Sequence, residues 1–177
     1  SYTQDGNSVV FSAKEIASSK KEKQKNEKIY FADNLGANFL NVKPFPFNTD
    51  GFSCKNPAFN TNGTALYFSS NQTGGFGGFD IWESKLENGK WTKPVNLGKL
   101  LNTKNDEINP FMVQDGQNHT LYFSSDREGG FGAFDIYSAK NNTGIWQDAE
   151  MQPAPINSAG DDISIIYDSE VKTGYFS

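Results

Sequence analysis

The chain has 177 residues, of which 36% are hydrophobic and 14% aromatic, with 15 phenylalanines and one cysteine. This composition is typical of one folded domain, and the aromatic excess suits sheets that stack through large flat side chains. The net charge of −5 argues against nucleic acid as a partner, because phosphate binding needs a concentrated basic surface. No stretch approaches the ~18 consecutive apolar residues of a membrane-spanning helix, and one cysteine excludes an internal disulfide.

Residues 1–13 predict a first hairpin, and the charged segment 14–28 follows it with six lysines and three glutamates. Because a charged run without apolar residues cannot build a core, we expect this segment to be a solvated hairpin tip and the most mobile part of the chain. The alternative is a basic finger that contacts an acidic partner or anionic headgroups. Its candidate contacts are Lys20, Lys21, Lys23 and Lys25.

Two apolar runs around a glycine-rich joint form a motif that occurs twice in the centre of the chain. The first joint is Gly74-Gly75-Phe76-Gly77-Gly78-Phe79-Asp80, and the second is Gly129-Gly130-Phe131-Gly132-Ala133-Phe134-Asp135. The two copies are 55 positions apart, as are the flanking residues Phe68 and Phe123. A repeat with this period indicates one supersecondary unit that is used several times.

Each unit is predicted to be a meander of four short antiparallel strands. Glycines tolerate positive φ and close backbone approach, so each joint is expected to be a tight hairpin between the second and third strands. Trp91 and Trp146 are also 55 apart, and each opens a fourth strand. We predict a structural role for the turn residues, since Asp beside a turn accepts backbone N–H bonds; they are Gly74, Gly75, Gly77, Gly78, Asp80, Gly129, Gly130, Gly132 and Asp135.

Weaker copies of the unit flank the clear pair, with anchor phenylalanines at Phe11, Phe68, Phe123 and Phe176. The sequence therefore predicts an all-β fold, a β-propeller of four-stranded antiparallel blades with about three and a half blades present. The expected blades are 1–49, 50–103, 104–158 and the start of a fourth at 159–177. Because a propeller normally needs at least four blades to close, we expect the missing strands on the same chain or on another one.

The segment from Phe123 to Tyr137, Phe-Ser-Ser-Asp-Arg-Glu-Gly-Gly-Phe-Gly-Ala-Phe-Asp-Ile-Tyr, resembles the WD-like β-propeller repeat of the TolB type. That repeat also occurs in envelope proteins with an OmpA-like peptidoglycan-binding domain, including the PorE-like component of type IX secretion in Bacteroidetes. The two central units match it closely, whereas the first unit lacks the glycine joint and its aspartate. The resemblance implies a protein of the periplasm or one associated with the outer membrane.

The acidic pairs Asp106-Glu107 and Asp161-Asp162 recur 55 positions apart, and paired carboxylates invite general acid–base chemistry. Because they recur with the repeat, we assign them to the scaffold. The alternative is that they converge on one propeller face to bind a cation or a basic partner.

With one histidine, His119, and one cysteine, Cys54, there is no zinc set and no nucleophilic triad. We predict no catalytic residue, no metal and no cofactor.

Three classes of function stay open. The first is a protein-interaction scaffold of the bacterial envelope that is not an enzyme, with Phe76, Arg127 and Phe131 as further candidate contacts. The second is a propeller glycosidase or a propeller attached to a peptidase, which would need acidic residues that break the repeat. The third is a module that binds glycan or peptidoglycan, which exposed tryptophans would favour.

Overall fold

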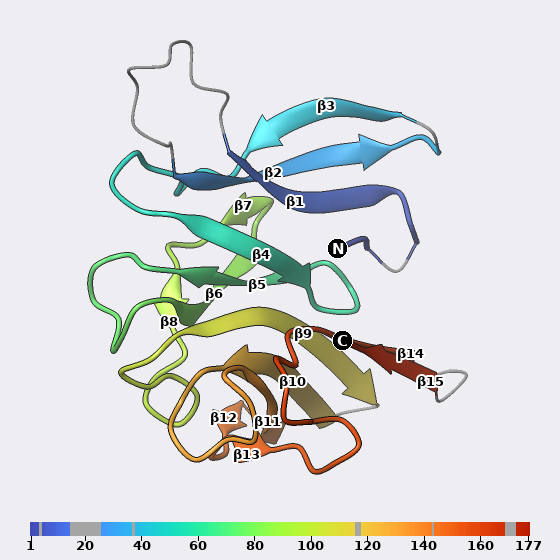
Figure 1. The fold of residues 1–177 in the computed structure, drawn as a ribbon. Helices are drawn as coiled ribbons and strands as arrows, with labels where there is room; N and C mark the ends of the chain where they lie inside the picture. Colours follow the sequence, from blue (N-terminus) through green and yellow to red (C-terminus); the bar gives the residue numbers. More distant parts are fainter. Residues whose placement is uncertain (4, 15–25, 37, 116–117, 143, 169–172) are drawn as a thin grey trace, which may run out of the picture.

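The computed structural model describes residues 1–177 except 4, 15–25, 37, 116–117, 143 and 169–172, and the described chain contains strands and no helix (Figure 1). Four antiparallel sheets follow one another along the chain. The first contains β1 (Ser8–Lys14), β2 (Glu27–Asn34) and β3 (Phe39–Pro44). The second contains β4 (Cys54–Phe59), β5 (Ala65–Ser70), β6 (Asp80–Glu87), β7 (Lys90–Trp91) and β8 (Val95–Asn96).

The third sheet repeats the second, with β9 (Glu107–Asp115), β10 (Asn118–Ser125), β11 (Asp135–Asn142), β12 (Ile145–Trp146) and β13 (Glu150–Met151). The fourth sheet is the hairpin of β14 (Ile165–Asp168) and β15 (Thr173–Phe176). The chain is thus a partial β-propeller, and the predicted fold class is confirmed. The blade boundaries stay a prediction.

The sheets share one register, which follows from the repeated apolar positions. Phe68 lies opposite Trp82 in the second sheet, as Phe123 lies opposite Tyr137 in the third. Phe11 likewise pairs with Tyr30 in the first sheet. Equivalent residues in sequence are therefore equivalent in space, so the sheets can be compared position by position.

Aromatic side chains join the second sheet to the first and the third sheet to the second. Trp91 of the second sheet stacks on Phe31 of the first, with ring centroids 5.3 Å apart and planes inclined by 3°. Trp146 of the third sheet meets Tyr67 of the second edge-on, at 6.4 Å and 90°. Offset and edge-to-face ring contacts add stability beyond the buried area. The fourth-strand tryptophans therefore bind successive sheets together.

Two expectations from the sequence, on the glycine-rich joints and on the charged segment, are not confirmed. The glycine-rich joints are not tight hairpins: they are loops that run from residue 71 to 79 and from 126 to 134. The expected mobility of segment 14–28 falls mostly on residues 15–25, outside the described part of the chain. No helix long and apolar enough to cross a membrane occurs among the described residues.

An asparagine side chain caps the backbone of β2, β6 and β11 in the first three sheets, and two of these asparagines, Asn102 and Asn157, are buried. Asn102 Oδ1 accepts a hydrogen bond from the Ile81 amide at 2.8 Å, and its Nδ2 donates to the Ile81 carbonyl at 3.0 Å. Asn157 makes the same pair of bonds to Ile136, and Asn48 makes it to Ile29. A side-chain amide carries the same donor and acceptor as a peptide group, so each asparagine substitutes for a strand neighbour.

Replacing Asn102 by alanine is expected to lower the free energy of unfolding by about 1–3 kcal/mol, because it leaves the buried Ile81 amide without a partner and the Ile81 carbonyl with the Leu97 amide as its remaining donor. Ile81 is fully buried, so water cannot replace the lost bonds. Urea denaturation measures the change. Asn118→Ala, which removes an exposed asparagine, is the control and is expected to stay within about 0.5 kcal/mol of the unaltered protein. Equal losses in both variants would contradict the assignment.

Candidate functional site: the glycine-rich loop face

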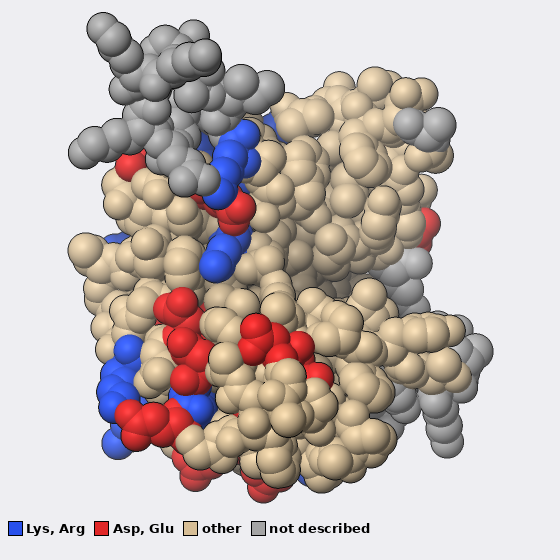
Figure 2. All heavy atoms as spheres, viewed as in Figure 1, with Lys and Arg blue, Asp and Glu red and all other residues tan. Residues whose placement is uncertain are grey.

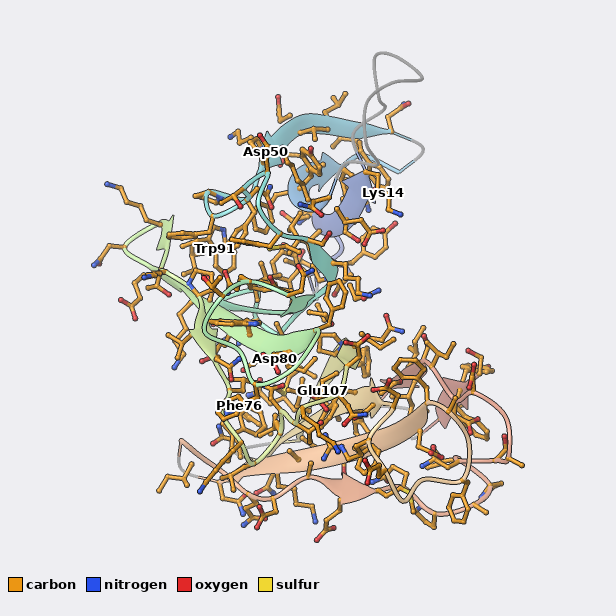
Figure 3. All side chains as sticks on the ribbon, turned by 60° about the vertical axis from the view of Figure 1, so that its left-hand side comes forward. Lys14, Asp50, Phe76, Asp80, Trp91 and Glu107 are labelled. Atoms are coloured by element: carbon orange, nitrogen blue, oxygen red, sulfur yellow. The ribbon has the colours of Figure 1, made fainter. Side chains whose placement is uncertain are left out.

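The two glycine-rich loops present aromatic side chains to solvent. Phe76 is 52% exposed and Phe131 is 56% exposed, at equivalent positions of successive sheets. Figure 3 shows Phe76 on the loop that leads into β6, with Asp80 at the start of that strand. Both phenylalanines are accessible, as a contact to a partner requires. Their role as partner contacts stays a prediction.

A buried aspartate holds each loop from inside. The Asp80 carboxylate accepts hydrogen bonds from the Phe76 amide at 2.8 Å and from Asn96 Nδ2 at 3.2 Å. Asp135 accepts one from the Gly132 amide at 3.2 Å. Burial raises the pKa of Asp80, while these hydrogen bonds act against that shift. The loops are therefore fixed in place rather than free arms.

The acidic pairs tie each loop to the next sheet. Asp106 Oδ1 accepts a hydrogen bond from the Phe79 amide at 2.7 Å, and Asp161 Oδ1 accepts one from the Phe134 amide at 3.3 Å. The second member of each pair turns toward its own connection: Glu107 accepts from the Thr103 amide and Asp162 from the Ser158 amide. All four carboxylates thus accept hydrogen bonds from backbone amides.

The glycines are required by close approach. A Cβ at Gly75 would collide with the Asp80 carboxylate, and one at Gly78 would collide with that of Asp106. At Gly77 the obstacle is the backbone of residues 103–105 in the connection to the third sheet. Gly74 and Gly129 have φ of +95° and +94°, a conformation in which L side chains are strained. The repeated glycines thus let each loop lie flat against the following connection.

Arg127 is engaged within the third sheet. Its Nη2 donates to the Leu101 carbonyl at 2.6 Å and lies 3.3 Å from Glu107 Oε1. The guanidinium also stacks 4.3 Å above the ring of Tyr137, and the side chain is only 17% exposed. Burial raises the pKa of Glu107, and hydrogen bonds from Thr103 and Ser125 and the charge of Arg127 act against that shift. The predicted contact of Arg127 with a partner stays a prediction.

Acidic side chains gather over the lower part of the face seen in Figure 2. Within the described residues, however, no three His, Cys, Asp or Glu side chains lie close enough together to hold a metal ion. Cys54 is buried, and burial raises its pKa to about 11, so the thiol is protonated at neutral pH. Lys20, Lys21, Lys23 and Lys25 lie outside the described residues.

A polar groove of about 570 Å³ lies between the second and third sheets, away from the glycine-rich loops. Tyr67, Glu83, Lys85 and His119 are among its lining residues. Glu83 is the one carboxylate among the described residues that line it, and it accepts a 2.9 Å hydrogen bond from the Tyr67 hydroxyl. Sequence reasoning singled out His119 but not Glu83, which varies between the repeats.

Compared by sequence, the chain matches neither a known family nor a curated protein. Its fold is similar to that of TolB from Acinetobacter baumannii, with a TM-score of 0.53 and 14% identity over 99% of this chain and 41% of that one. It is also similar to a thermostable family-43 glycoside hydrolase (TM-score 0.61, 14% identity, 96% of this chain and 61% of that one). An α-L-arabinofuranosidase from Lactobacillus brevis gives a TM-score of 0.58 and 11% identity, over 94% and 59% of the two chains.

The chain therefore spans less than two thirds of each of these three proteins. At such identities the likeness shows a shared propeller fold. It also corrects one prediction: the inference that the chain is not an enzyme is wrong as drawn, because two of the similar structures are glycoside hydrolases. One fold carries unrelated functions at different sites, so the lack of a repeated catalytic set in the sequence does not exclude an enzyme.

Proposed function

We propose that the chain is a propeller segment of a bacterial envelope protein that binds a partner protein through its glycine-rich loop face. The observation that carries the proposal is the pair of exposed phenylalanines, Phe76 and Phe131, at equivalent positions on fixed loops. Aromatic anchors supply much of the binding energy in protein interfaces, and fixed loops lose little conformational entropy on binding. The fold likeness to TolB supports a place in the periplasm or at the outer membrane.

The repeat resemblance supports a narrower form of the proposal. In that form the segment belongs to an outer-membrane or type IX secretion assembly linked to peptidoglycan, in a bacterium of the Bacteroidetes. Its partners are then other envelope proteins, together with the remaining blades of the propeller. Neither nucleic acid nor a cofactor enters this proposal, and the net charge of −5 agrees with a non-nucleic-acid partner.

Photo-crosslinking in intact producing cells tests the loop face. A photoreactive amino acid at position 76 or 131 is expected to crosslink to the same protein, whereas one at Ile145, which is 71% exposed but lies in β12, is expected not to. For the identified protein, the double substitution Phe76→Ala and Phe131→Ala is expected to weaken binding about 30-fold or more, as for interface hot spots. Equal crosslinking from position 145, or unchanged affinity of the double variant, would count against the proposal.

A glycosidase is the second candidate, and the fold likeness to a family-43 glycoside hydrolase and an α-L-arabinofuranosidase favours it. Glycoside hydrolysis uses two carboxyl groups that flank the scissile bond. In the groove between the second and third sheets the described lining supplies Glu83 alone. Release of reducing sugar from arabinose-containing polysaccharides by the full-length protein is the assay that tests this candidate.

A further inference from the structure

A second cavity, of about 690 Å³, lies beside Trp82 on the second sheet. It is bordered by the connection between the first and second sheets, the start of the glycine-rich loop, and residues 93–96. Its walls include the rings of Phe47, Phe52 and Trp82, and its polar lining includes Gln72, Thr73 and Lys93. A volume of this size, with aromatic walls and a few polar groups, is typical of small-ligand sites.

The third sheet shows what fills the equivalent place. There Arg127 lies over the ring of Tyr137, bonded to the Leu101 carbonyl and paired with Glu107. In the second sheet the residue 55 positions before Arg127 is Gln72, and the residue 55 before Tyr137 is Trp82. The side chain that lies over Tyr137 in the third sheet is thus replaced by a shorter one beside Trp82, where Phe47 and Phe52 pack against the core cluster that includes Trp82, and both Trp82 and Tyr137 are 6% exposed.

The carboxylate is replaced as well. Glu107 pairs in register with Ser125 across β9 and β10, and Cys54 pairs in register with the equivalent Ser70 across β4 and β5. Cys54 therefore stands where Glu107 stands, with its thiol 3.6 Å from the Ser70 hydroxyl. Both members of the buried ion pair are exchanged for neutral residues. Beside Trp82 the second sheet therefore has two neutral residues and a cavity, whose walls include the half-buried Phe47 and Phe52.

We propose that this cavity binds a neutral glycan, with a sugar ring packed against the aromatic walls. A pyranose or furanose ring has apolar C–H faces for Phe47, Phe52 and Trp82, and hydroxyls around its edge for Gln72, Thr73 and Lys93. The loss of the carboxylate disfavours a cationic ligand, since a buried charge needs a partner. An apolar peptide segment would leave the polar lining unpaired, which costs about 1–3 kcal/mol per buried group.

This proposal is independent of the loop-face proposal, because the cavity does not include Phe76 or Phe131. It also uses a different place from the groove that contains Glu83. A negative result for the loop face or for the groove would therefore not count against glycan binding in this cavity. A negative result for glycan binding would likewise not count against the other two proposals.

The test is a titration of the full chain with neutral disaccharides, in which tryptophan fluorescence and NMR measure binding. Cellobiose, arabinobiose and chitobiose distinguish hexose, pentose and N-acetylated rings. Gln72→Arg, which places in the second sheet the side chain that covers the ring in the third, is expected to weaken binding at least about tenfold. Thr73→Arg blocks the cavity from an exposed position and guards against misfolding of the first variant. Gln147→Arg adds the same charge at an exposed position of the third sheet and is expected to bind as the unaltered protein does.

Saturable binding of at least one disaccharide, lost in both cavity variants and kept in Gln147→Arg, is the expected result. No binding by any of the three sugars overturns the proposal. So does equal binding by the two cavity variants and the unaltered protein. An apolar peptide that binds at this cavity more tightly than the sugars do would overturn the assignment to a glycan.

Discussion

Arg127→Gln is expected to lower the free energy of unfolding at pH 8 by about 3–5 kcal/mol, because it leaves the carboxylate of Glu107 buried and unpaired. The Glu107 side chain is fully buried, and Arg127 is its one cationic partner among the described ion pairs. Breaking a buried pair costs more than the pair contributes, since the remaining charge keeps its desolvation penalty. Urea denaturation measures the loss.

The loss is expected to depend on pH. Burial already raises the pKa of Glu107, and removing the positive charge of Arg127 raises it further. A carboxyl group whose pKa is higher in the folded state than in the unfolded state stabilises the fold while it is protonated. Its contribution to the free energy of unfolding is therefore lost as the pH rises through the folded-state pKa. Arg127→Gln is therefore expected to differ less from the unaltered protein near pH 4 than at pH 8.

The second sheet supplies the matched control, because it contains Cys54 and Gln72 in place of Glu107 and Arg127. The double variant Glu107→Cys and Arg127→Gln copies that neutral pair and is expected to recover most of the stability lost in Arg127→Gln alone. The coupling between the two sites in a double-mutant cycle is the quantity to report. Additive losses would show that the ion pair is not the reason for the effect.

The sheets could be predicted from the sequence because the residues that repeat are the apolar residues of the strands. Phe68 and Phe123, Ile81 and Ile136, and Trp91 and Trp146 all recur at the same period, and each pair occupies equivalent positions in the register. The shape of the joints was not predictable in the same way. Glycines indicate close approach but do not reveal whether the neighbour is the loop itself or, as here, the next connection.

Long-range polar contacts were also beyond the sequence. Asn102 and Asn157 recur after each unit, yet their bonds to Ile81 and Ile136 depend on how the connection folds back on the third strand. The same holds for the exchange of Glu107 for Cys54. Those two residues are 53 positions apart rather than 55, so the equivalence emerges only from the strand register.

Gly77→Ala is expected to lower the free energy of unfolding by about 2–4 kcal/mol, because the added methyl group would overlap the backbone of residues 103–105. That backbone leads directly into β9, whose first residue, Glu107, is buried, so it cannot move aside without disturbing the third sheet. The exposed phenylalanine beside it would then be displaced together with the loop. Thermal and urea unfolding measure the loss, and Gly132→Ala is expected to behave alike, since its Cβ would meet the backbone of Gly160.

Gly78→Ala is the matched control, because the third sheet naturally has an alanine at the equivalent position. Ala133 occupies the equivalent position there, and the neighbouring bond from Phe134 to Asp161 is 3.3 Å long, against 2.7 Å from Phe79 to Asp106. A side chain such as Asp106 can shift to admit a methyl group, whereas a backbone segment held in a sheet cannot. Gly78→Ala is therefore expected to cost about 1 kcal/mol, at the low end of overpacking losses. Equal losses at positions 77 and 78 would mean that loop flexibility, and not the adjacent backbone, requires these glycines.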